Sequence, residues 1–440
     1  MTATDAAAPA KPSLSIWTIL LLLPVIAHCI AVASFALFED YGALTTIDYA
    51  VLGATAVYIL VLAVVLRTGR LLKPLLIGTY AALGVVFVLE IAARVAVPPV
   101  PEQVPLAPGV RESVAAEGMQ GISGEITYSV NSLGVRGPEV KLDEVDLKIL
   151  CVGSTFVEAR YVTDRRSWPW QLQEQLASRL DRDVFVGNAG IPGTIAIQYD
   201  YLLRNYALAK KFDWVIVCCG LDDINVRLDG VHVDVVAGTE QNVLTPAKPD
   251  VPFYFYYRRS AIPRAWRALF AEDESSSPHD TGAWIAEDRI VRRQKLRENP
   301  LEDLPPDYDL MVASYREELE RIIETCRELN LKPVLTTHPT RYGKDLPAEV
   351  TDTFTLFQQS GVYVPEVMEQ IVAGFNGAMR EVCRERDVPC IDLDGQLPKD
   401  ETVFFDDLHI NASGNDQVAR IVADWFVREL GENGAAAESP

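Results

Sequence analysis

The chain has 440 residues and a formal net charge of −21, which is long enough for a main domain with additional parts. So acidic a chain is not expected to bind nucleic acid, because that function needs a basic surface. Through residue 97 the acidic and basic residues cancel, so the whole net charge lies in residues 98–440, with 35 basic and 56 acidic residues. The hydrophobic fraction of 49% is high for a soluble protein, and the excess lies near the N-terminus.

Three long apolar stretches follow a short tail at residues 1–13, and they cover residues 14–38, 49–66 and 75–97. Each is long enough, or nearly so, to cross a hydrocarbon core of about 30 Å as a helix. We therefore expect three transmembrane helices within residues 14–97 and a lipid bilayer as a partner. Two alternatives are a signal peptide cleaved near Ala31-Val32-Ala33 and three buried helices of a globular core.

The charges in the two connecting loops predict the orientation. The loop between the second and third stretches is basic, and the loop between the first and second is acidic. Because basic loops stay on the cytoplasmic side, the N-terminus is expected to be cytoplasmic. The chain is then a multi-pass protein of the cytoplasmic membrane, and everything after residue 97 is extracytoplasmic.

The remainder of the chain alternates between predicted strands and predicted helices. Apolar, β-branched runs predict strands at residues 148–152, 183–187, 214–219, 333–337 and 389–393. Apolar residues with helical spacing predict helices at residues 166–180, 194–209, 314–329, 364–386 and 412–430. This order predicts a three-layer α/β/α fold with a doubly wound parallel sheet, whose site lies at the carboxyl ends of the strands.

The same patterns predict the domain boundaries. We expect a linker and lead-in segment at 98–146, the α/β domain at 147–430 and a disordered tail at 431–440. Residues 227–309 separate the third strand from its helix and are expected to form an inserted cap, because ordinary loops are far shorter.

Four short sequence blocks lie at the predicted strand ends and before the last helix. They are Gly153-Ser154-Thr155-Phe156-Val157-Glu158, Asn188-Ala189-Gly190-Ile191-Pro192-Gly193, Gly220-Leu221-Asp222-Asp223 and Asp406-Asp407-Leu408-His409. Their order resembles the SGNH (GDSL-type) family of esterases and acyltransferases. The segment Asn131-Ser132-Leu133-Gly134-Val135-Arg136-Gly137-Pro138-Glu139 resembles the one that precedes the first strand in membrane-anchored members of that family.

The resemblance implies a nucleophile, a base and an orienting carboxylate. His409 matches the base and Asp406 the carboxylate, with Asp407 as the substitute. Thr155 occupies the nucleophile position, and Ser154, one residue earlier, is the alternative. Threonine keeps the hydroxyl but adds a methyl group that crowds attack.

Two further positions match the oxyanion donors of the family, namely Gly190 and Asp222. Asp222 stands where the family has asparagine, and an ionised carboxylate donates no hydrogen bond. Losing one such donor costs about 10²–10³ in rate. His338 follows the fourth strand and is expected near the same edge of the sheet, in a structural role or in contact with substrate.

The leading functional hypothesis is an extracytoplasmic ester hydrolase or O-acyltransferase that acts on an acylated glycan or lipid. No metal or organic cofactor is implied. One alternative is a pseudoenzyme that binds a glycan or protein, and another is a membrane assembly factor. The oligomeric state is left open, as is a disulfide among Cys326, Cys383 and Cys390.

Overall fold

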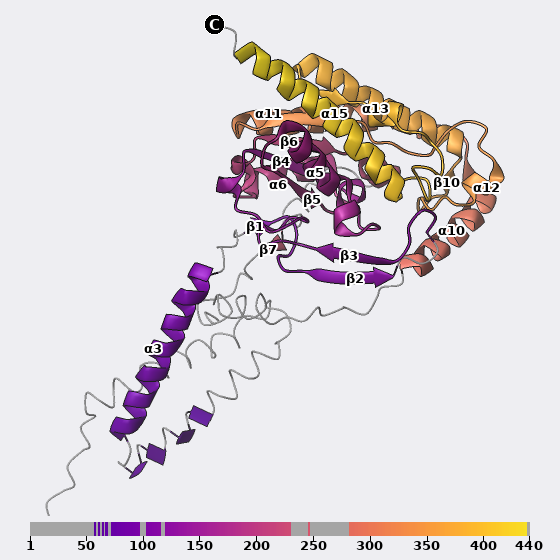
Figure 1. Ribbon diagram of the computed structural model, residues 1–440. Coiled ribbons are helices and arrows are strands. Elements are labelled where there is room, and N and C mark those ends of the chain that lie inside the picture. Colours follow the sequence, from indigo (N-terminus) through magenta and orange to yellow (C-terminus); the bar gives the residue numbers. More distant parts are fainter. Residues whose placement is uncertain are drawn as a thin grey trace, which may run out of the picture. The chain divides into compact units, whose positions relative to one another are not determined.

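The computed structural model describes most of the chain (Figure 1). The described residues are scattered positions between 57 and 68 and the ranges 72–96, 103–115, 119–229, 245–246 and 281–437. The chain divides into two compact units. One comprises Met1–Pro99 with Lys248–Ala271, and the other comprises Val100–Ala247 with Glu272–Pro440.

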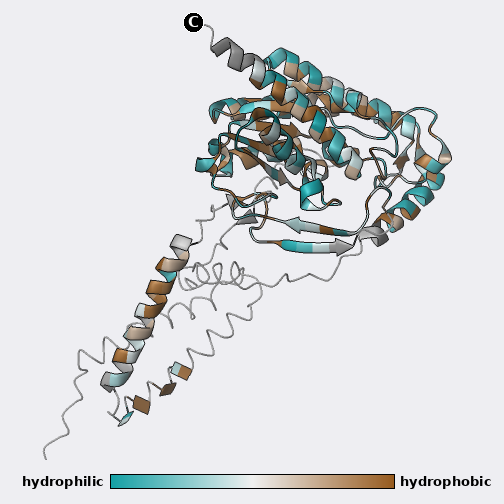
Figure 2. Cartoon of the chain, in the orientation of Figure 1, coloured by the Kyte–Doolittle hydropathy of each residue, from teal (hydrophilic) through white to brown (hydrophobic). Residues whose placement is uncertain are grey.

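In the first unit, the helix α3 (Leu72–Ala96) covers the third apolar stretch. Figure 2 shows mainly apolar residues along α3, and Val86, Phe87 and Val88 are 53%, 65% and 64% exposed. Among the residues described, no helix meets both the length and the apolarity that a membrane span needs. The prediction of three transmembrane helices is therefore not supported. The first predicted span lies wholly, and the second largely, outside the described residues.

The second unit is built on a five-stranded parallel sheet. Its strands are β4 (Leu147–Gly153), β5 (Val184–Gly190), β6 (Trp214–Cys218), β9 (Lys332–Thr336) and β11 (Cys390–Ile391). Their order across the sheet is β11-β9-β6-β4-β5. All five predicted strands are confirmed. The order doubles back from β5 past β4 to β6, so the sheet is wound in both directions, as predicted.

Helices cover both faces of this sheet. One face carries α5 (Trp168–Leu180) and α15 (Ala412–Ala437), and the other carries α6 (Ala196–Asn205), α11 (Tyr308–Glu328) and α13 (Pro365–Arg386). Alternate residues of β4 point to opposite faces: Ile149 packs with α5 and α15, whereas Leu150 packs with α6, α11 and α13. The α/β/α prediction is therefore confirmed. α15 continues to Ala437, past its predicted end at residue 430.

The lead-in segment is part of this second unit rather than a free linker. It forms the antiparallel pair β2 (Arg111–Ala115) and β3 (Glu125–Ser129), and then a turn in which Asn131 Oδ1 accepts from the N–H groups of Leu133 and Val135. Gly134 has a φ of 75°, and a Cβ there would lie 2.3 Å from Val104 Cβ. Only glycine fits that close approach. Val104 belongs to β1 (Gln103–Val104), which pairs with β7 (Thr245–Pro246).

The end of the predicted cap forms the helix α10 (Thr281–Glu298), followed by β8 (Pro300–Leu301), which pairs with β10 (Val362–Tyr363). Arg289, Arg292 and Lys295 of α10 donate to backbone carbonyls between Thr351 and Gln359. The cap is thus tied to the loop after β9. Between residues 230 and 280 the predicted cap lies outside the described residues, apart from residues 245–246.

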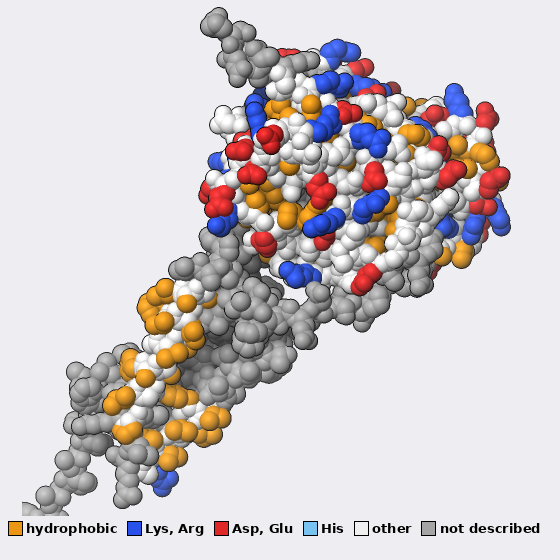
Figure 3. Space-filling view, viewed as in Figure 1, with side chains coloured by type: hydrophobic (Ala, Val, Ile, Leu, Met, Phe, Trp, Pro, Cys, Tyr) orange, Lys and Arg blue, Asp and Glu red, His pale blue; other side chains and the backbone are white. Residues whose placement is uncertain are grey.

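Short elements complete the unit: α4 (Thr155–Glu158), α7 (Leu221–Leu228), α12 (Ala348–Thr351), α14 (Leu393–Gln396), η1 (Leu142–Glu144), η2 (Asp164–Arg166) and η3 (Ala209–Lys211). On the face seen in Figure 3, acidic and basic side chains are interspersed over this unit.

Candidate active site

Residues from four parts of the chain meet at the carboxyl edge of the sheet. Ser154 and Thr155 follow β4, Gly193 follows β5, Asp222 follows β6, and His409 lies just before α15. Parallel strands bring their carboxyl ends to one edge, which explains why residues so distant in the sequence gather here.

The best-defined pair is Asp406 and His409. His409 Nδ1 lies 2.7 Å from Asp406 Oδ2, and Asp406 is fully buried. The other carboxylate oxygen of Asp406 accepts from the backbone N–H groups of Leu408 (2.9 Å) and His409 (2.6 Å). The carboxylate is therefore held rigidly, and it fixes the orientation of the imidazole through Nδ1.

The charge of His409 is controlled by the carboxylates around it. Burial lowers the pKa of His409, but Asp406, Asp407 and Asp222 together outweigh burial and raise that pKa above its usual value. The imidazole thus takes up a proton more readily than a free histidine, as a general base should.

Asp407 has a different role from Asp406. Its Oδ2 accepts from Tyr342 Oη (2.6 Å) and Leu356 N (3.0 Å), and its Oδ1 accepts from Thr355. Both oxygens are committed to the loop after β9. Asp406, and not its substitute, is therefore the residue that orients His409.

Aromatic rings hold the imidazole on two sides. The ring of Phe405 stacks on His409 with centroids 5.5 Å apart, and Tyr161 meets it edge-on at 4.7 Å. Arg289 of α10 donates to the carbonyl of Phe405, and Ile285 of α10 packs against Phe405 and Tyr161. The inserted cap thus forms part of the wall behind the histidine.

Ser154 lies at the turn between β4 and α4, and it is buried. Its Oγ accepts a hydrogen bond from Gly193 N at 3.1 Å, and it also bonds to the Asp222 carboxylate. Thr155 is the first residue of α4 and is partly buried. The structure therefore brings the alternative nucleophile, Ser154, into the polar centre of the site.

Asp222 is the neighbour that Ser154 and His409 share. Burial raises the pKa of Asp222 to about 6, and the hydrogen bond from Ser154 and the positive charge of His409 partly oppose that rise. In its ionised form the carboxylate accepts a hydrogen bond from the serine hydroxyl. It therefore competes with His409 as the hydrogen-bond acceptor of that hydroxyl.

Gly190 does not lie where an oxyanion donor is needed. Its N–H donates to Asn188 Oδ1 at 2.9 Å, and a Cβ at Gly190 would lie 2.1 Å from Glu158 N. The residue serves the close approach of β5 and α4. Gly193, the last residue of the same sequence block, presents its N–H to Ser154 instead. The predicted residue Gly190 is thus not the one whose N–H meets Ser154, because the chain turns between the two glycines.

His338 lies near this centre but is held as a structural group. Burial lowers its pKa to about 4, so it is neutral at pH 7, and its Nδ1 lies 3.1 Å from the carbonyl of Pro339. Its backbone N–H donates to Asn376 Oδ1, and its carbonyl accepts from Asn376 Nδ2.

Sequence reasoning missed three residues: Gly193, Asn188 and Arg136. Each stands inside a block that had been noticed, so the blocks were the available signal. Their roles depend on which backbone atoms they reach in the fold.

The described residues contain no group of three or more His, Cys, Asp or Glu side chains arranged to hold a metal ion. The six described cysteines are all free. The disulfide considered for Cys326, Cys383 and Cys390 is therefore not formed in this structure.

Comparison with known families decides the classification. The GDSL-like Lipase/Acylhydrolase family matches residues 151–417, which include all four sequence blocks and, apart from the start of β4, the whole sheet. The chain belongs to this family. GDSL-like acylhydrolases are ester hydrolases, and this agrees with the Asp406–His409 pair at the sheet edge. A comparison with curated proteins gave no match.

Several solved structures resemble this GDSL-like protein at low identity. The acetyl xylan esterase AlAXEase is 14% identical, with 63% of this chain and 98% of that chain covered and a TM-score of 0.34. Axe2, an acetylxylan esterase from Geobacillus stearothermophilus, is 13% identical, with 65% and 95% covered and a TM-score of 0.35. The lipase/acylhydrolase from Enterococcus faecalis is 16% identical, with 63% and 94% covered and a TM-score of 0.35.

Proposed function

We propose that this protein hydrolyses a carboxylic ester through a covalent acyl-enzyme, with Ser154 as nucleophile. The observation that carries the proposal is the convergence on Asp222. This carboxylate accepts a hydrogen bond from the Ser154 hydroxyl and interacts electrostatically with His409. The Nδ1 atom of His409 is in turn hydrogen-bonded to Asp406. A nucleophile, a base and an orienting carboxylate thus share one small, largely buried site.

In the proposed mechanism, His409 accepts the Ser154 proton while Oγ attacks the ester carbonyl. The carbonyl oxygen becomes an oxyanion, and the N–H of Gly193, which already points at Ser154 Oγ across 3.1 Å, donates to it. The protonated His409 then gives its proton to the leaving alcohol. Water, activated by the same histidine, releases the acid and restores Ser154.

The ionised carboxylate of Asp222 is expected to slow this reaction. Its negative charge lies where a donor would stabilise the oxyanion, and it holds the proton of the nucleophile. Because the Asp222 carboxylate is mainly ionised near neutral pH, we expect a low turnover on simple esters. The same observation favours the second candidate function, a catalytically impaired protein that binds an acylated ligand in this site.

The substrate that we propose is an acylated glycan or an acylated lipid. The alternative reaction is transfer of the acyl group to an alcohol acceptor instead of to water. This rests on the family, which joins lipases with other acylhydrolases. We also propose, from the loop charges of residues 14–97 alone, that the domain acts outside a membrane. A reporter enzyme fused after residue 97 tests this, because a cytoplasmic signal contradicts it.

The test of the function uses the full-length protein and 4-nitrophenyl acetate. Hydrolysis should be measurable in the wild type and abolished in His409→Ala. A matched control is His338→Ala, because that neutral histidine lies nearby without a place in the mechanism. Hydrolysis that survives His409→Ala contradicts the mechanism. Absence of hydrolysis in the wild type, with retained binding of an acetylated oligosaccharide, supports the second function.

A further inference from the structure

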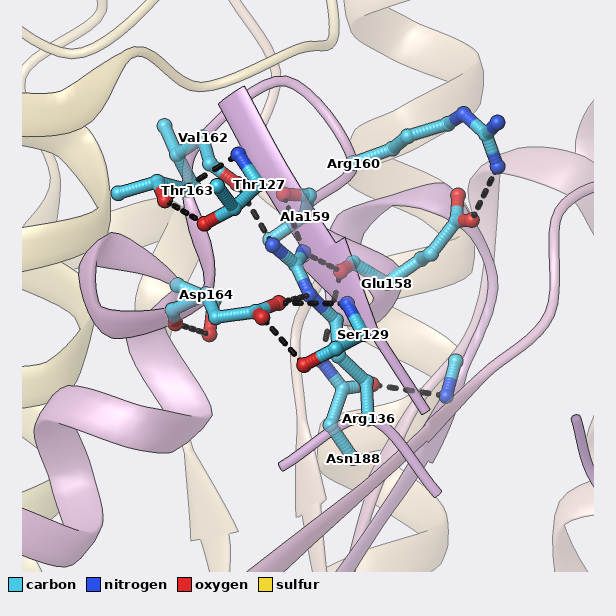
Figure 4. Close-up of polar contacts among 12 residues, drawn as sticks. Thr127, Ser129, Arg136, Glu158, Ala159, Arg160, Val162, Thr163, Asp164 and Asn188 are labelled. Atoms are coloured by element: carbon cyan, nitrogen blue, oxygen red, sulfur yellow. Dashed lines mark hydrogen bonds and ion pairs between the residues drawn. The ribbon is translucent and has the colours of Figure 1, made fainter. Parts of the chain in front are cut away.

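The guanidinium of Arg136 is buried beside Glu158, Ala159 and Val162, at the end of α4 and after it (Figure 4). Its Nη1 donates to the carbonyls of Glu158 (2.6 Å) and Ala159 (2.7 Å), and its Nη2 donates to the carbonyl of Val162 (2.6 Å). Its Nε donates to Asp164 Oδ1 at 2.8 Å. Three of the four bonds thus reach backbone carbonyls at the end of α4 and just after it.

Few other donors reach these carbonyls: that of Ala159 accepts from Val162 N (3.2 Å), and that of Glu158 accepts from Asn188 Nδ2 (3.3 Å). α4 ends at Glu158, the next residue Ala159 has a left-handed φ of 52°, and the last carbonyls of a helix have no intrahelical donor. A buried carbonyl without a donor costs about 1–3 kcal/mol. The planar, always charged guanidinium meets several carbonyls at once, which a lysine ammonium does not do with the same geometry.

Asn188 completes the arrangement from the β5 side. Its Nδ2 donates to the carbonyl of Val157 at 2.7 Å, and its backbone pairs with that of Arg136 in both directions, at 2.8 and 3.2 Å. Arg136 and Asn188 therefore hold the end of α4 together. β5 continues from Asn188 to Gly190, and three residues further on lies Gly193, whose N–H meets Ser154.

Asp164 anchors the guanidinium from the other side. Its carboxylate accepts from the N–H of Ser129 (3.1 Å) and from the Ser129 hydroxyl (2.5 Å), so β3 holds the acid that holds the arginine.

We propose that Arg136 is a positioning residue of the esterase site, which fixes the far end of α4 and so keeps Ser154 in register with Gly193. The inference rests on the proposed function. Movement at the end of so short a helix is passed to its start, where Ser154 and Thr155 lie. A displacement of about 1 Å at a nucleophile costs about 10² in rate.

The test compares Arg136→Lys with Arg160→Lys in the full-length protein. Arg160 is a matched control, because its guanidinium lies over the same Tyr128 ring, at 5.2 Å against 4.7 Å for Arg136. Its polar contacts go to the carboxylates of Glu112 and Glu158 rather than to the backbone of α4. Both variants keep the positive charge.

Two readouts are expected to change in Arg136→Lys and not in the control. The kcat for 4-nitrophenyl acetate should fall about 10²-fold while KM stays within about threefold, since positioning acts on the transition state. The amide hydrogens of Val157, Glu158 and Ala159, which bond to the carbonyls of Ser154 and Thr155, should exchange about tenfold faster or more, with the rest of the sheet unchanged.

The proposal is overturned if Arg136→Lys keeps the kcat of the control, or if exchange rises throughout the domain, which indicates general destabilisation. If Arg136→Lys does not fold, Asp164→Asn replaces it, and a smaller fall in kcat with the same local exchange is expected. If the wild type lacks esterase activity, the proposed function fails, and exchange at residues 157–159 still decides whether Arg136 holds the turn.

Discussion

Gly193 donates its backbone N–H to Ser154 Oγ at 3.1 Å, across 39 residues of sequence. The contact joins the loop after β5 to the turn after β4, which are neighbouring strands of the sheet. A donor already aimed at the nucleophile oxygen needs little rearrangement to meet an oxyanion that forms beside it. The register of two strands thus brings the proposed nucleophile, Ser154, and its proposed donor, Gly193, together.

Substitution at the two neighbouring hydroxyls should identify the nucleophile. We expect Ser154→Ala to lower kcat/KM for 4-nitrophenyl acetate by about 10³-fold or more, because it removes the attacking oxygen. Thr155→Ala should change kcat/KM by less than about tenfold, since Thr155 flanks the attacking residue. The reverse ranking assigns the nucleophile to Thr155, and Thr155→Ser should then keep or raise the activity.

Replacing Asp222 with asparagine should accelerate hydrolysis. The amide removes a negative charge from beside the oxyanion, supplies a donor and releases the Ser154 proton to His409. An oxyanion donor is worth about 10²–10³ in rate, so we expect kcat to rise at least about tenfold. The formation of the acyl-enzyme in single-turnover experiments measures it. Unchanged or slower acylation shows that the carboxylate has a useful role of its own.

The pH dependence should follow the protonation of His409. Only the neutral imidazole accepts the serine proton, so kcat/KM should increase with pH through the raised pKa of His409. Asp406→Asn removes the carboxylate that raises this pKa. Its profile should therefore move to lower pH, while the maximal rate falls by about 10²–10⁴-fold. A pH profile of both proteins measures the shift, and a midpoint that does not move contradicts the pairing.

Asp222 should also make folding stability depend on pH. Its carboxyl has a pKa of about 6 in the folded protein, whereas an unfolded aspartate titrates near 4. The folded state therefore binds the proton more tightly, and stability decreases as pH rises from about 4 to about 6. Asp222→Asn lacks this loss. Its advantage over the wild type in urea unfolding should grow to about 2 kcal/mol between pH 4 and pH 7.

The two glycines of the second block should differ in their tolerance of alanine. At Gly190 a Cβ would lie 2.1 Å from Glu158 N, so Gly190→Ala should destabilise the domain by about 3 kcal/mol or more. At Gly193 the space is open and only the φ of 71° is unfavourable, so Gly193→Ala should cost about 1–2 kcal/mol. Urea unfolding measures both, and equal costs contradict the close packing of β5 on α4.

The sequence by itself determined the parts of this protein that depend on local pattern. Apolar runs of strand length and helical periodicity predict the five parallel strands and the helices that cover them, because burial on two faces requires those patterns. The Asp406–His409 pair was also visible, since the two residues are three positions apart and one turn of backbone brings them together. Neither conclusion depends on which distant segments of the chain contact each other.

Only the tertiary structure decided which residues complete the site. Whether Ser154 or Thr155 faces the centre depends on how the chain turns after β4. A shift of this turn by one residue would exchange the positions of the two hydroxyl groups. Gly193 rather than Gly190 meets Ser154 because the register Gly153↔Gly190 places Gly190 under α4 and carries the chain on to Gly193. Arg136 reaches α4 because β3 and β5 hold it there. These contacts join segments far apart in sequence, and their geometry is set by strand register and packing, which no local pattern encodes.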